Sequence, residues 1–247
     1  NIHKSGISLL KKNKNFKYEI IQDPKKNILK KKLKDFDAIS LRTTKFDKEL
    51  FKLAPKLKII SRHGVGYDNI DINAAKEKKI TISITSNSLS ATVAEHVFFM
   101  MLNISKGLNT YTKIVKEGNF NKRKELPLSK ELYKKTILII GFGRIAKNLI
   151  KKCISFDMKV LVYDPYVNKK TINYYGGKKI NNLYKSIKLS DYVSIHTPLT
   201  KETKNLINMK VLKSMKKSAI IINSSRGGII NENDLNKAIN KNIIFGA

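Results

Sequence analysis

Cysteine, acidic residues and long apolar runs are all scarce in this chain of 247 residues. The single cysteine, Cys153, excludes an intramolecular disulfide and suits a reducing cytosol. The longest apolar run, near Val97 to Leu102, is too short to cross a bilayer. The polar start of the chain predicts no signal peptide, and because residue 1 is not Met we expect a trimmed N-terminus. These features predict a cytoplasmic protein without a membrane partner.

Acidic residues are few beside basic ones: 50 Lys and Arg against 19 Asp and Glu give a formal net charge of +31. Such a charge can indicate a nucleic-acid or membrane partner. The lysines are spread along the whole chain, however, and many alternate with Asn and Ile. A general drift toward Lys, Asn and Ile explains this pattern at least as well. We therefore expect no specific nucleic-acid binding, although the positive field would attract anionic substrates and cofactors.

The length allows one large or two modest domains, and alternating helix and strand patterns predict α/β architecture. We expect a small doubly wound unit over residues 1–88 and a second domain over residues 89–247. The stretch from Asn87 to His96 opens a long helix that would reach about Lys106, with Ser90 as its N-cap and Gly107 just past its end, and cross between the two domains. The segment 108–131, which contains Gly118, Asn119 and Pro127, is expected to be mostly irregular.

Hydrophobic periodicity and breakers predict the individual elements. In the first domain the expected strands are Tyr18–Ile21, 37–41, 57–61 and 80–85, and the expected helices are 5–12, 27–33, 46–53 and 71–78. In the second domain we expect strands near residues 137, 160, 192 and 220 with helices between them, a helix at Glu232–Asn240, and a further strand beginning at Ile243–Phe245.

Residues 136 to 164 carry the most informative pattern. The apolar run Ile137–Ile140 leads into Gly141 and Gly143, as a strand buried on both faces does when it ends in a tight turn. Gly141 permits the turn, and Gly143 removes the side chain that would keep backbone N–H groups away from a pyrophosphate. The following helix, from about Arg144 to Phe156, would direct its positive N-terminus at those phosphates.

Asp164 lies at the tip of the next predicted strand, 21 residues beyond Gly143. A carboxylate there can accept hydrogen bonds from both ribose hydroxyls of an adenosine and would repel a 2′-phosphate. Ala146 stands at the third glycine position, where only close helix–strand packing is needed. The pattern favours a Rossmann domain that binds NAD, and an α/β unit for another nucleoside ligand remains the alternative.

Four motifs occur in order along the chain: Gly64-Val-Gly66-Tyr-Asp-Asn-Ile-Asp71, Gly141-Phe-Gly143-Arg-Ile-Ala146, His196-Thr-Pro-Leu-Thr200 and Asn223-Ser-Ser-Arg226-Gly-Gly. With them the chain resembles the D-isomer-specific 2-hydroxyacid dehydrogenases from about residue 37 to its last residue. The resemblance implies two doubly wound parallel-sheet domains with the active site in the cleft between them. The first would be a flavodoxin-like substrate domain, and the second a Rossmann NAD-binding domain that is incomplete at its C-terminal end.

The resemblance also implies residue roles. Arg226 would be the catalytic arginine, which grips the substrate carboxylate and polarises the carbonyl that receives hydride. The expected cofactor contacts are Val65, Gly141, Gly143, Arg144, Ile145, Asp164, His196, Thr197, Pro198, Ser224 and Ser225. The expected substrate contacts are Arg42, Arg62, Gly64, Val65 and Gly66.

The sequence positions of the histidines and acidic residues indicate which of them could act in catalysis or bind a metal. His196 directly precedes a proline in a cofactor loop, so we expect it to contact the cofactor and not to act as the acid. His96, in the long helix, is expected to be a packed or interface residue, and for His63 a near-site role and simple packing stay equally open. No pair or triad of His, Cys, Asp or Glu has metal-ligand spacing, and we expect no metal.

The implied activity is hydride transfer between NAD(H) and C2 of a small D-2-hydroxy or 2-keto acid. Arg42 and Arg62 favour 3-phosphoglycerate, and with it serine biosynthesis, over hydroxypyruvate or glyoxylate. An NAD-sensing binding protein on the same fold, like the C-terminal-binding-protein corepressors, is the alternative of another class. The resemblance further implies a homodimer, with the 90–106 helix and residues 108–131 as its interface.

Two departures from the family pattern stand out. Lys134 and Leu138 occupy positions where the family usually has glycine, which we expect to alter only loop and packing detail. The family's acid/base histidine and its glutamate partner would lie beyond Ala247. We therefore expect the chain by itself to be inactive.

Overall fold

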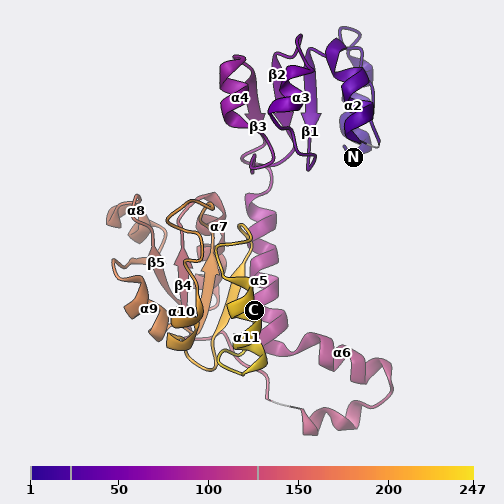
Figure 1. Cartoon of the computed structure of the whole chain (residues 1–247). Helices are drawn as coiled ribbons and strands as arrows, with labels where there is room; N and C mark the ends of the chain where they lie inside the picture. The colour runs from indigo at the N-terminus through magenta and orange to yellow at the C-terminus, as the bar shows by residue number, and fades with distance from the viewer. Residues whose placement is uncertain (1, 23, 127) are drawn as a thin grey trace. The chain divides into compact units, whose positions relative to one another are not determined.

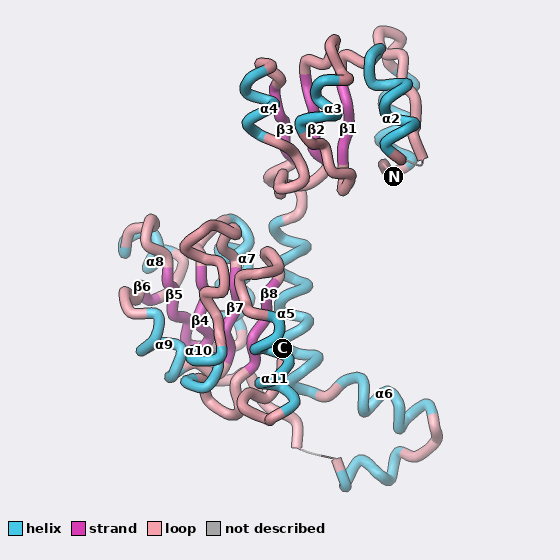
Figure 2. The backbone as a smooth tube through the Cα atoms, viewed as in Figure 1, coloured by secondary structure: helices cyan, strands magenta, loops and turns pink. Residues whose placement is uncertain are grey.

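The computed structural model describes residues 2–22, 24–126 and 128–247. It divides the chain into two compact units, Asn1–Leu89 and Ser90–Ala247, each built on a parallel sheet (Figures 1 and 2). The boundary follows Leu89, whereas the prediction put it after residue 88. Pro127, which the sequence marked as a breaker, lies outside the described residues.

The first unit has three parallel strands in the order β1-β2-β3. These strands are β1 (Ala38–Leu41), β2 (Ile59–Arg62) and β3 (Thr81–Ile84), and the helices are α1 (Lys4–Lys12), α2 (Lys26–Lys32), the 3₁₀-helix η1 (Leu33–Asp35), α3 (Lys48–Lys52) and α4 (Ile72–Glu77). One cluster of buried residues, with Phe46, Phe51 and Ile60 at most 2% exposed, packs α2, α3 and α4 on the sheet. Side-chain caps from Asp47 and Asp71 start α3 and α4.

The predicted strand at Tyr18–Ile21 is wrong, because these residues form no strand. The sheet begins at β1, so the segment has no neighbouring strand with which to pair. Tyr18 and Ile20 stay exposed, and Glu19 forms an ion pair with Lys32 of α2 instead. A short alternation of apolar and polar residues specifies a strand only where a ladder partner exists.

The second unit has five parallel strands in the order β6-β5-β4-β7-β8 (Figure 2). They are β4 (Thr136–Ile140), β5 (Lys159–Tyr163), β6 (Lys178–Lys179), β7 (Tyr192–Ile195) and β8 (Ile220–Asn223). The chain starts in the middle and winds outward in both directions, which is the strand order of a dinucleotide-binding sheet. The predicted Rossmann domain is confirmed, and the two-residue β6 is the strand that the sequence pattern missed.

Helices cover both faces of this sheet. One core cluster packs α5 (Ser90–Lys106), α7 (Arg144–Ser155) and α8 (Lys169–Tyr174), and the other packs α9 (Leu183–Leu189), α10 (Met209–Ser214) and α11 (Glu232–Asn240). Along β4, Ile137 and Ile139 point into the first cluster, and Leu138 and Ile140 point into the second. This alternation explains why the strand reads as an unbroken apolar run.

The prediction of a mostly irregular segment at 108–131 is wrong in its first half. Residues Leu108–Lys116 form α6, and Phe120–Glu125 form the 3₁₀-helix η2. Gly107 does adopt the left-handed conformation (φ +60°) that ends α5, but α6 starts directly after it. Gly118 (φ +69°) ends α6 instead of preventing it. Figure 1 shows α6 extending away from the sheet of its own unit.

The segment after α11 pairs with β8 only at its end. The Phe245 N–H donates to the Ala219 carbonyl at 2.9 Å, and the Ile221 N–H donates to the Gly246 carbonyl at 3.0 Å. An isolated parallel bridge joins Ile220 to Gly246, whereas Ile243–Phe245, where a strand was predicted to begin, form no strand. Within the described part of the chain, no helix combines the length and apolarity needed to span a membrane.

Candidate active site

Three candidate functional turns of the second unit lie at the same edge of its sheet. In the parallel register Ile140 pairs with Ile195, and Ile195 pairs with Asn223. The glycine turn after β4, the His196 loop after β7 and the Arg226 turn after β8 therefore all leave the carboxyl ends of adjacent strands. This is the edge at which open α/β sheets bind ligands.

The two glycines of the β4 turn differ in what surrounds them. Gly141 has φ +89°, and a Cβ there would lie 2.9 Å from the carbonyl carbon and oxygen of His196. Gly143 has an ordinary φ of −82°, and nothing lies within 4 Å of the Cβ it lacks. Gly143 is also the N-cap of α7, and no side chain caps that helix. The start of α7 thus combines first-turn amides without a side-chain cap and open space beside Gly143, which suits a pyrophosphate.

Phe142, between these glycines, fixes the turn to its surroundings. The residue is 2% exposed, and its ring meets the Tyr175 ring edge-on, with centroids 5.7 Å apart. Its backbone N–H donates to Asp164 Oδ2 at 2.8 Å. The turn that would hold the phosphates is therefore tied directly to the carboxylate predicted to bind the ribose.

The Asp164 carboxylate has fewer free hydrogen-bond acceptor sites than the sequence suggests. Its Oδ1 accepts from the N–H groups of Tyr166 and Val167 at 2.8 and 2.9 Å, in addition to the Phe142 bond on Oδ2. A carboxylate offers about four lone-pair sites, and three are in use. The side chain can accept one ribose hydroxyl without losing an amide, whereas the prediction assigned it both.

His196 follows β7, and its backbone N–H donates to the Ile140 carbonyl at 2.8 Å. Its Nε2 lies 2.8 Å from Ser194 Oγ, and its buried Nδ1 has no partner among the described residues. Burial lowers the pKa of His196 to about 4, so the ring is neutral at physiological pH. In the same loop, Thr203 Oγ1 donates to the Pro198 carbonyl at 2.7 Å and holds the Thr197-Pro198 segment in place.

Asn223 organises the turn after β8. Its Oδ1 accepts from the N–H and the hydroxyl of Ser225 at 3.0 and 2.7 Å, and its Nδ2 donates to the Arg226 carbonyl at 2.7 Å. The Arg226 guanidinium donates to the Ser225 carbonyl at 2.7 Å. Ser224 Oγ is buried without a partner among the described residues. It is the second such atom at this edge of the sheet, after His196 Nδ1.

The first unit presents its own glycine turn after β2. Gly64 has φ +134°; its N–H donates to Thr85 Oγ1 at 2.9 Å, and its carbonyl accepts from the Thr85 N–H at 3.1 Å. The backbone N–H groups of Val65 and Gly66 have no acceptor in the described structure. Two adjacent free amides can bind a carboxylate, as predicted for this turn.

The two arginines of this unit lie at strand ends. Arg62 ends β2, folds its guanidinium over Gly64 and donates to the His63 carbonyl. Arg42 directly follows β1 and is exposed, and Asn69 Nδ2 donates to the carbonyls of Arg42 and Thr44 at 3.4 and 2.7 Å. His63 is exposed beside this turn, which leaves its role open.

Several residues that shape these turns were missed by sequence reasoning: Thr85, Ser194, Thr203 and, as a role within its motif, Asn223. A detectable signal existed for two of them. Ser194 is the polar residue inside an apolar strand two positions before His196, and strand periodicity puts both on one face. The Thr200–Thr203 spacing is typical of a reciprocal hydroxyl turn.

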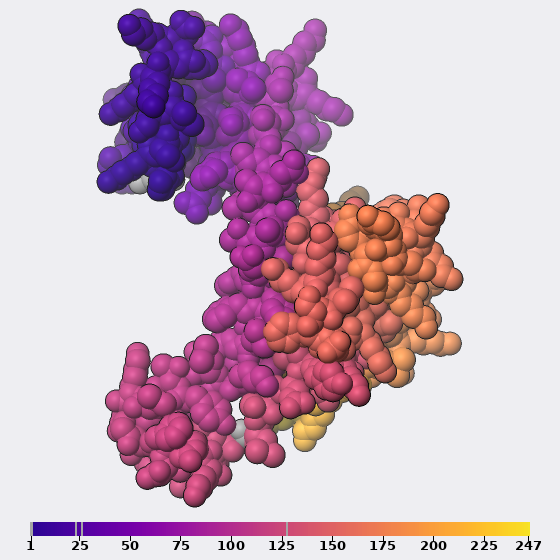
Figure 3. Space-filling view, turned by 180° about the vertical axis from the view of Figure 1, so that it is seen from behind, coloured from indigo at the N-terminus to yellow at the C-terminus, as the bar shows by residue number. Residues whose placement is uncertain are grey.

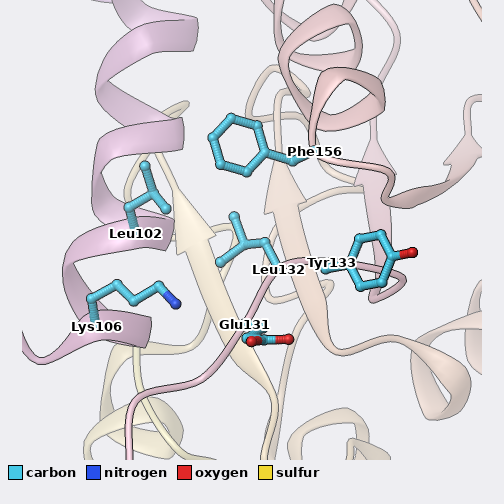
Figure 4. Close-up of a pocket in the computed structure, with 6 residues that line it drawn as sticks. All are labelled: Leu102, Lys106, Glu131, Leu132, Tyr133 and Phe156. Carbon is cyan, nitrogen blue, oxygen red and sulfur yellow. The ribbon is translucent and has the colours of Figure 1, made fainter.

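Two shallow hollows, of about 320 and 360 Å³, lie elsewhere in the second unit. The first is at the amino end of β4, where Leu102 and Lys106 project from α5 toward the segment that precedes the strand (Figure 4). The second hollow also contains Glu131 and Tyr133. Both therefore lie at the edge of the sheet opposite the glycine turn, and neither contributes to the candidate site.

The residues at the carboxyl edge fit NAD. The uncapped N-terminus of α7, the open space at Gly143, the Asp164 carboxylate and the two unpartnered buried atoms all suit a ligand rich in phosphate and hydroxyl oxygens. His96 is not part of this arrangement, since it is exposed on α5 and stacks on Phe99 at 6.2 Å between centroids. Among the described residues, no group of three or more His, Cys, Asp or Glu is placed to hold a metal.

Comparison with known proteins agrees with this geometry. The family model described as D-isomer specific 2-hydroxyacid dehydrogenase, NAD binding domain, matches residues 98–247. Across the whole chain, identity is 34% to the D-3-phosphoglycerate dehydrogenase of Methanocaldococcus jannaschii and 36% to the glyoxylate reductase of Thermococcus litoralis. The solved structure of D-lactate dehydrogenase from Aquifex aeolicus, complexed with NAD and lactic acid, superposes with a TM-score of 0.89 at 30% identity.

These relatives are longer than the chain. The alignments cover 46% of the M. jannaschii protein and 76% of the T. litoralis protein. The structural match covers 99% of this chain and 73% of the A. aeolicus chain. The matched residues include every turn of the second unit described above. The chain belongs to the D-isomer-specific 2-hydroxyacid dehydrogenases, a family of NAD-dependent oxidoreductases, and carries their NAD-binding domain.

Proposed function

We propose that the complete protein transfers a hydride between NAD(H) and C2 of a small D-2-hydroxy or 2-keto acid. The observation that carries the proposal is the shared carboxyl edge, which presents an uncapped helix N-terminus after β4 and a guanidinium after β8. The first can hold the pyrophosphate, and the second can hold a substrate carboxylate.

Each residue would have a distinct task. NAD supplies the hydride acceptor when it is bound. Arg226 would bind the substrate carboxylate with its two-pronged guanidinium and polarise the carbonyl, and Val65 and Gly66 would donate backbone N–H groups to the same carboxylate. We assign the proton donor neither to His196, which is buried and neutral, nor to His96, which is exposed on α5.

For the substrate we propose 3-phosphoglycerate, which would place the protein in serine biosynthesis. Arg42 and Arg62 lie at neighbouring strand ends and could meet a phosphate group that hydroxypyruvate and glyoxylate lack. Both kinds of enzyme occur among the relatives. Comparing kcat/KM for 3-phosphoglycerate and glycerate in the complete protein tests this choice. An Arg42→Ala variant should lose the preference for the phosphorylated acid, and equal values in the unchanged protein would favour a reductase of small keto acids.

The alternative of another class is an NAD-sensing binding protein on the same fold. The Arg226 turn and the glycine turn would be present in both cases, so the site does not separate them. Turnover does. An enzyme reduces hydroxypyruvate with NADH, whereas a sensor binds NADH and changes its association state without turnover.

Cofactor binding is tested by titrating the chain with NADH and following nicotinamide fluorescence. We expect a dissociation constant well below millimolar. Asp164→Ala should weaken binding about tenfold or more, because it removes a ribose acceptor and the anchor of the Phe142 turn. Glu117→Ala, which removes an exposed carboxylate at the end of α6, serves as the control and should leave the affinity unchanged. Failure of the unchanged chain to bind would overturn the proposal.

A further inference from the structure

The buried pair formed by Ser194 and His196 has an unusual hydrogen-bond balance. Both side chains lie on one face of the β7 edge, with Ser194 Oγ 2.8 Å from His196 Nε2. Ser194 is 1% exposed, and its hydroxyl has no other hydrogen-bond partner in the described structure. The other ring nitrogen, Nδ1, is buried and unpartnered. A buried polar atom without a partner requires an explanation in a folded protein.

Counting donors and acceptors selects one tautomer. Since burial lowers the pKa of His196 to about 4, the ring at neutral pH carries one N–H and one lone pair. If Nε2 carried the hydrogen, the Ser194 hydroxyl hydrogen would have no acceptor and the Nδ1 lone pair no donor. If Ser194 donates to Nε2, only the Nδ1–H group is left unsatisfied. The second arrangement leaves fewer buried groups without partners.

The place of His196 in the fold indicates what the remaining N–H can serve. His196 follows β7 directly beside the glycine turn, since the Cβ that Gly141 lacks would lie 2.9 Å from the His196 carbonyl. Ser224, whose hydroxyl is the other unpartnered buried group of this edge, follows the residue that pairs with Ile195. Two unsatisfied groups on adjacent strand ends, next to an uncapped helix N-terminus, suit a ligand with many acceptor oxygens.

We infer that Ser194 is a positioning residue that holds His196 as the Nδ1–H tautomer, so that the ring donates a hydrogen bond to an acceptor oxygen of the bound dinucleotide. The inference rests on the NAD-binding function and adds a residue that acts through another. A neutral donor also suits this place physically, because the buried ring would lose solvation if it were charged. The alternative is a purely structural pair, in which the Ser194 hydroxyl satisfies one ring nitrogen of His196 and neither side chain affects cofactor binding.

The tautomer can be read without cofactor. Long-range ¹H–¹⁵N correlation spectra of the ¹⁵N-labelled chain near neutral pH distinguish a protonated Nδ1 from a protonated Nε2. The chain has only four histidines, and the signals lost in His196→Asn assign the ring. We expect Nδ1 to carry the hydrogen in the unchanged chain, and a mixture of tautomers in Ser194→Ala.

The consequence for binding is tested with the NADH titration. Ser194→Ala should weaken NADH binding by roughly three- to tenfold, and Ser194→Thr, which keeps the hydroxyl, should restore it. His196→Asn keeps an N–H near the position of Nδ1 and should bind better than His196→Leu. Ser190→Ala is the matched control, because it removes a buried serine hydroxyl that donates to Ser186 at 2.8 Å, at the other end of β7.

The outcomes separate this inference from the proposed function. A protonated Nε2 in the unchanged chain would overturn the inference and leave NAD binding intact. Equal NADH affinities of Ser194→Ala and Ser190→Ala would also overturn it. Absence of NADH binding by the unchanged chain would overturn the proposed function, whatever the tautomer. Because the spectrum of the unchanged chain needs no variant, the tautomer remains testable even if Ser194→Ala fails to fold.

Discussion

At the scale of single residues, Lys134 shows why one departure from the family pattern matters. It has φ +57°, in the left-handed region, in the turn that precedes β4. An L residue pays about 1–2 kcal/mol for this conformation, which explains why the family usually places glycine there. Leu138, the other departure, is fully buried in β4 and packs in the core as an ordinary strand residue. The expectation that Lys134 alters only loop detail leaves out this strain.

Replacing Lys134 with Gly should therefore raise the free energy of unfolding by about 0.5 kcal/mol. Relief of the left-handed strain outweighs the greater entropy of glycine in the unfolded chain. The exposed contact of the Lys134 ammonium with the Tyr133 ring, at 4.9 Å, offsets little of this gain. Urea denaturation measures the change. Lys135→Gly, at a neighbouring position without positive φ, should instead destabilise the protein. A loss of stability in Lys134→Gly would contradict the argument.

At the scale of elements, the β4–turn–α7 unit separates two uses of glycine that the motif alone does not distinguish. Gly141 is required for folding, since its φ is positive and a Cβ would meet the backbone of the β7 loop. We expect Gly143 to be required for ligand binding instead, since its φ is ordinary and nothing lies within 4 Å of the Cβ it lacks. One substitution should therefore affect stability and the other affinity.

Gly141→Ala should lower the free energy of unfolding by about 2 kcal/mol or more, through backbone strain and the contact with His196. Gly143→Ala should change stability by less than about 0.5 kcal/mol, yet weaken NADH binding about tenfold or more because a methyl group would enter the phosphate space. Urea denaturation and NADH titration of both variants separate the two effects. If Gly143→Ala binds NADH as tightly as the unchanged chain, the pyrophosphate does not lie against this turn.

Elements with a full local pattern could be predicted from the sequence. The strand, turn and helix from Thr136 to Ser155 combine a long apolar run, glycines and helical periodicity, and they appear as expected. The predictions that failed concern elements that depend on distant partners or that are too short to show a pattern. Tyr18–Ile21 alternates like a strand but has no neighbouring strand, and β6 is too short to leave a pattern. In α6, apolar residues at helical spacing indicate a helix, and Gly118 lies just past its end and is not a sign of irregular structure.

The motifs of the candidate site could be predicted from the sequence, but the hydrogen bonds that connect its residues could not. Glycines and acids at strand ends can be recognised because their chemistry requires those residue types. The three amides on Asp164 and the Ser194–His196 pair arise from tertiary contacts that no local pattern encodes. Asn223 belongs to a recognisable motif, but its hydrogen bonds to Ser225 and Arg226 depend on the conformation of the turn, which the motif does not specify.

At the scale of the whole molecule, strong positive charge coexists with exposed apolar side chains. On α5, α6 and η2, Phe99, Leu108, Val115 and Phe120 are 49%, 47%, 57% and 53% exposed. Figure 3 shows the segment 108–125 standing out from the rest of its unit as a separate lobe. We propose that α5 and this lobe form the interface of a homodimer, because apolar residues on a protruding element gain most from burial against a second copy.

The charge determines how such a dimer should respond to salt. Two chains of formal charge +31 repel each other, and this repulsion is screened as the Debye length shortens. The dimer should therefore tighten when NaCl is raised from about 50 mM to about 500 mM, whereas binding to nucleic-acid phosphates would weaken steeply over the same range. Sedimentation velocity over a range of protein concentrations measures the association. The double variant Val115→Glu/Phe120→Glu should be monomeric, and Tyr184→Glu, at an exposed aromatic residue on α9, should dimerise normally. A chain that stays monomeric at every salt and protein concentration, or a dimer that dissociates as salt rises, would show that apolar burial on α5 and the lobe does not drive assembly.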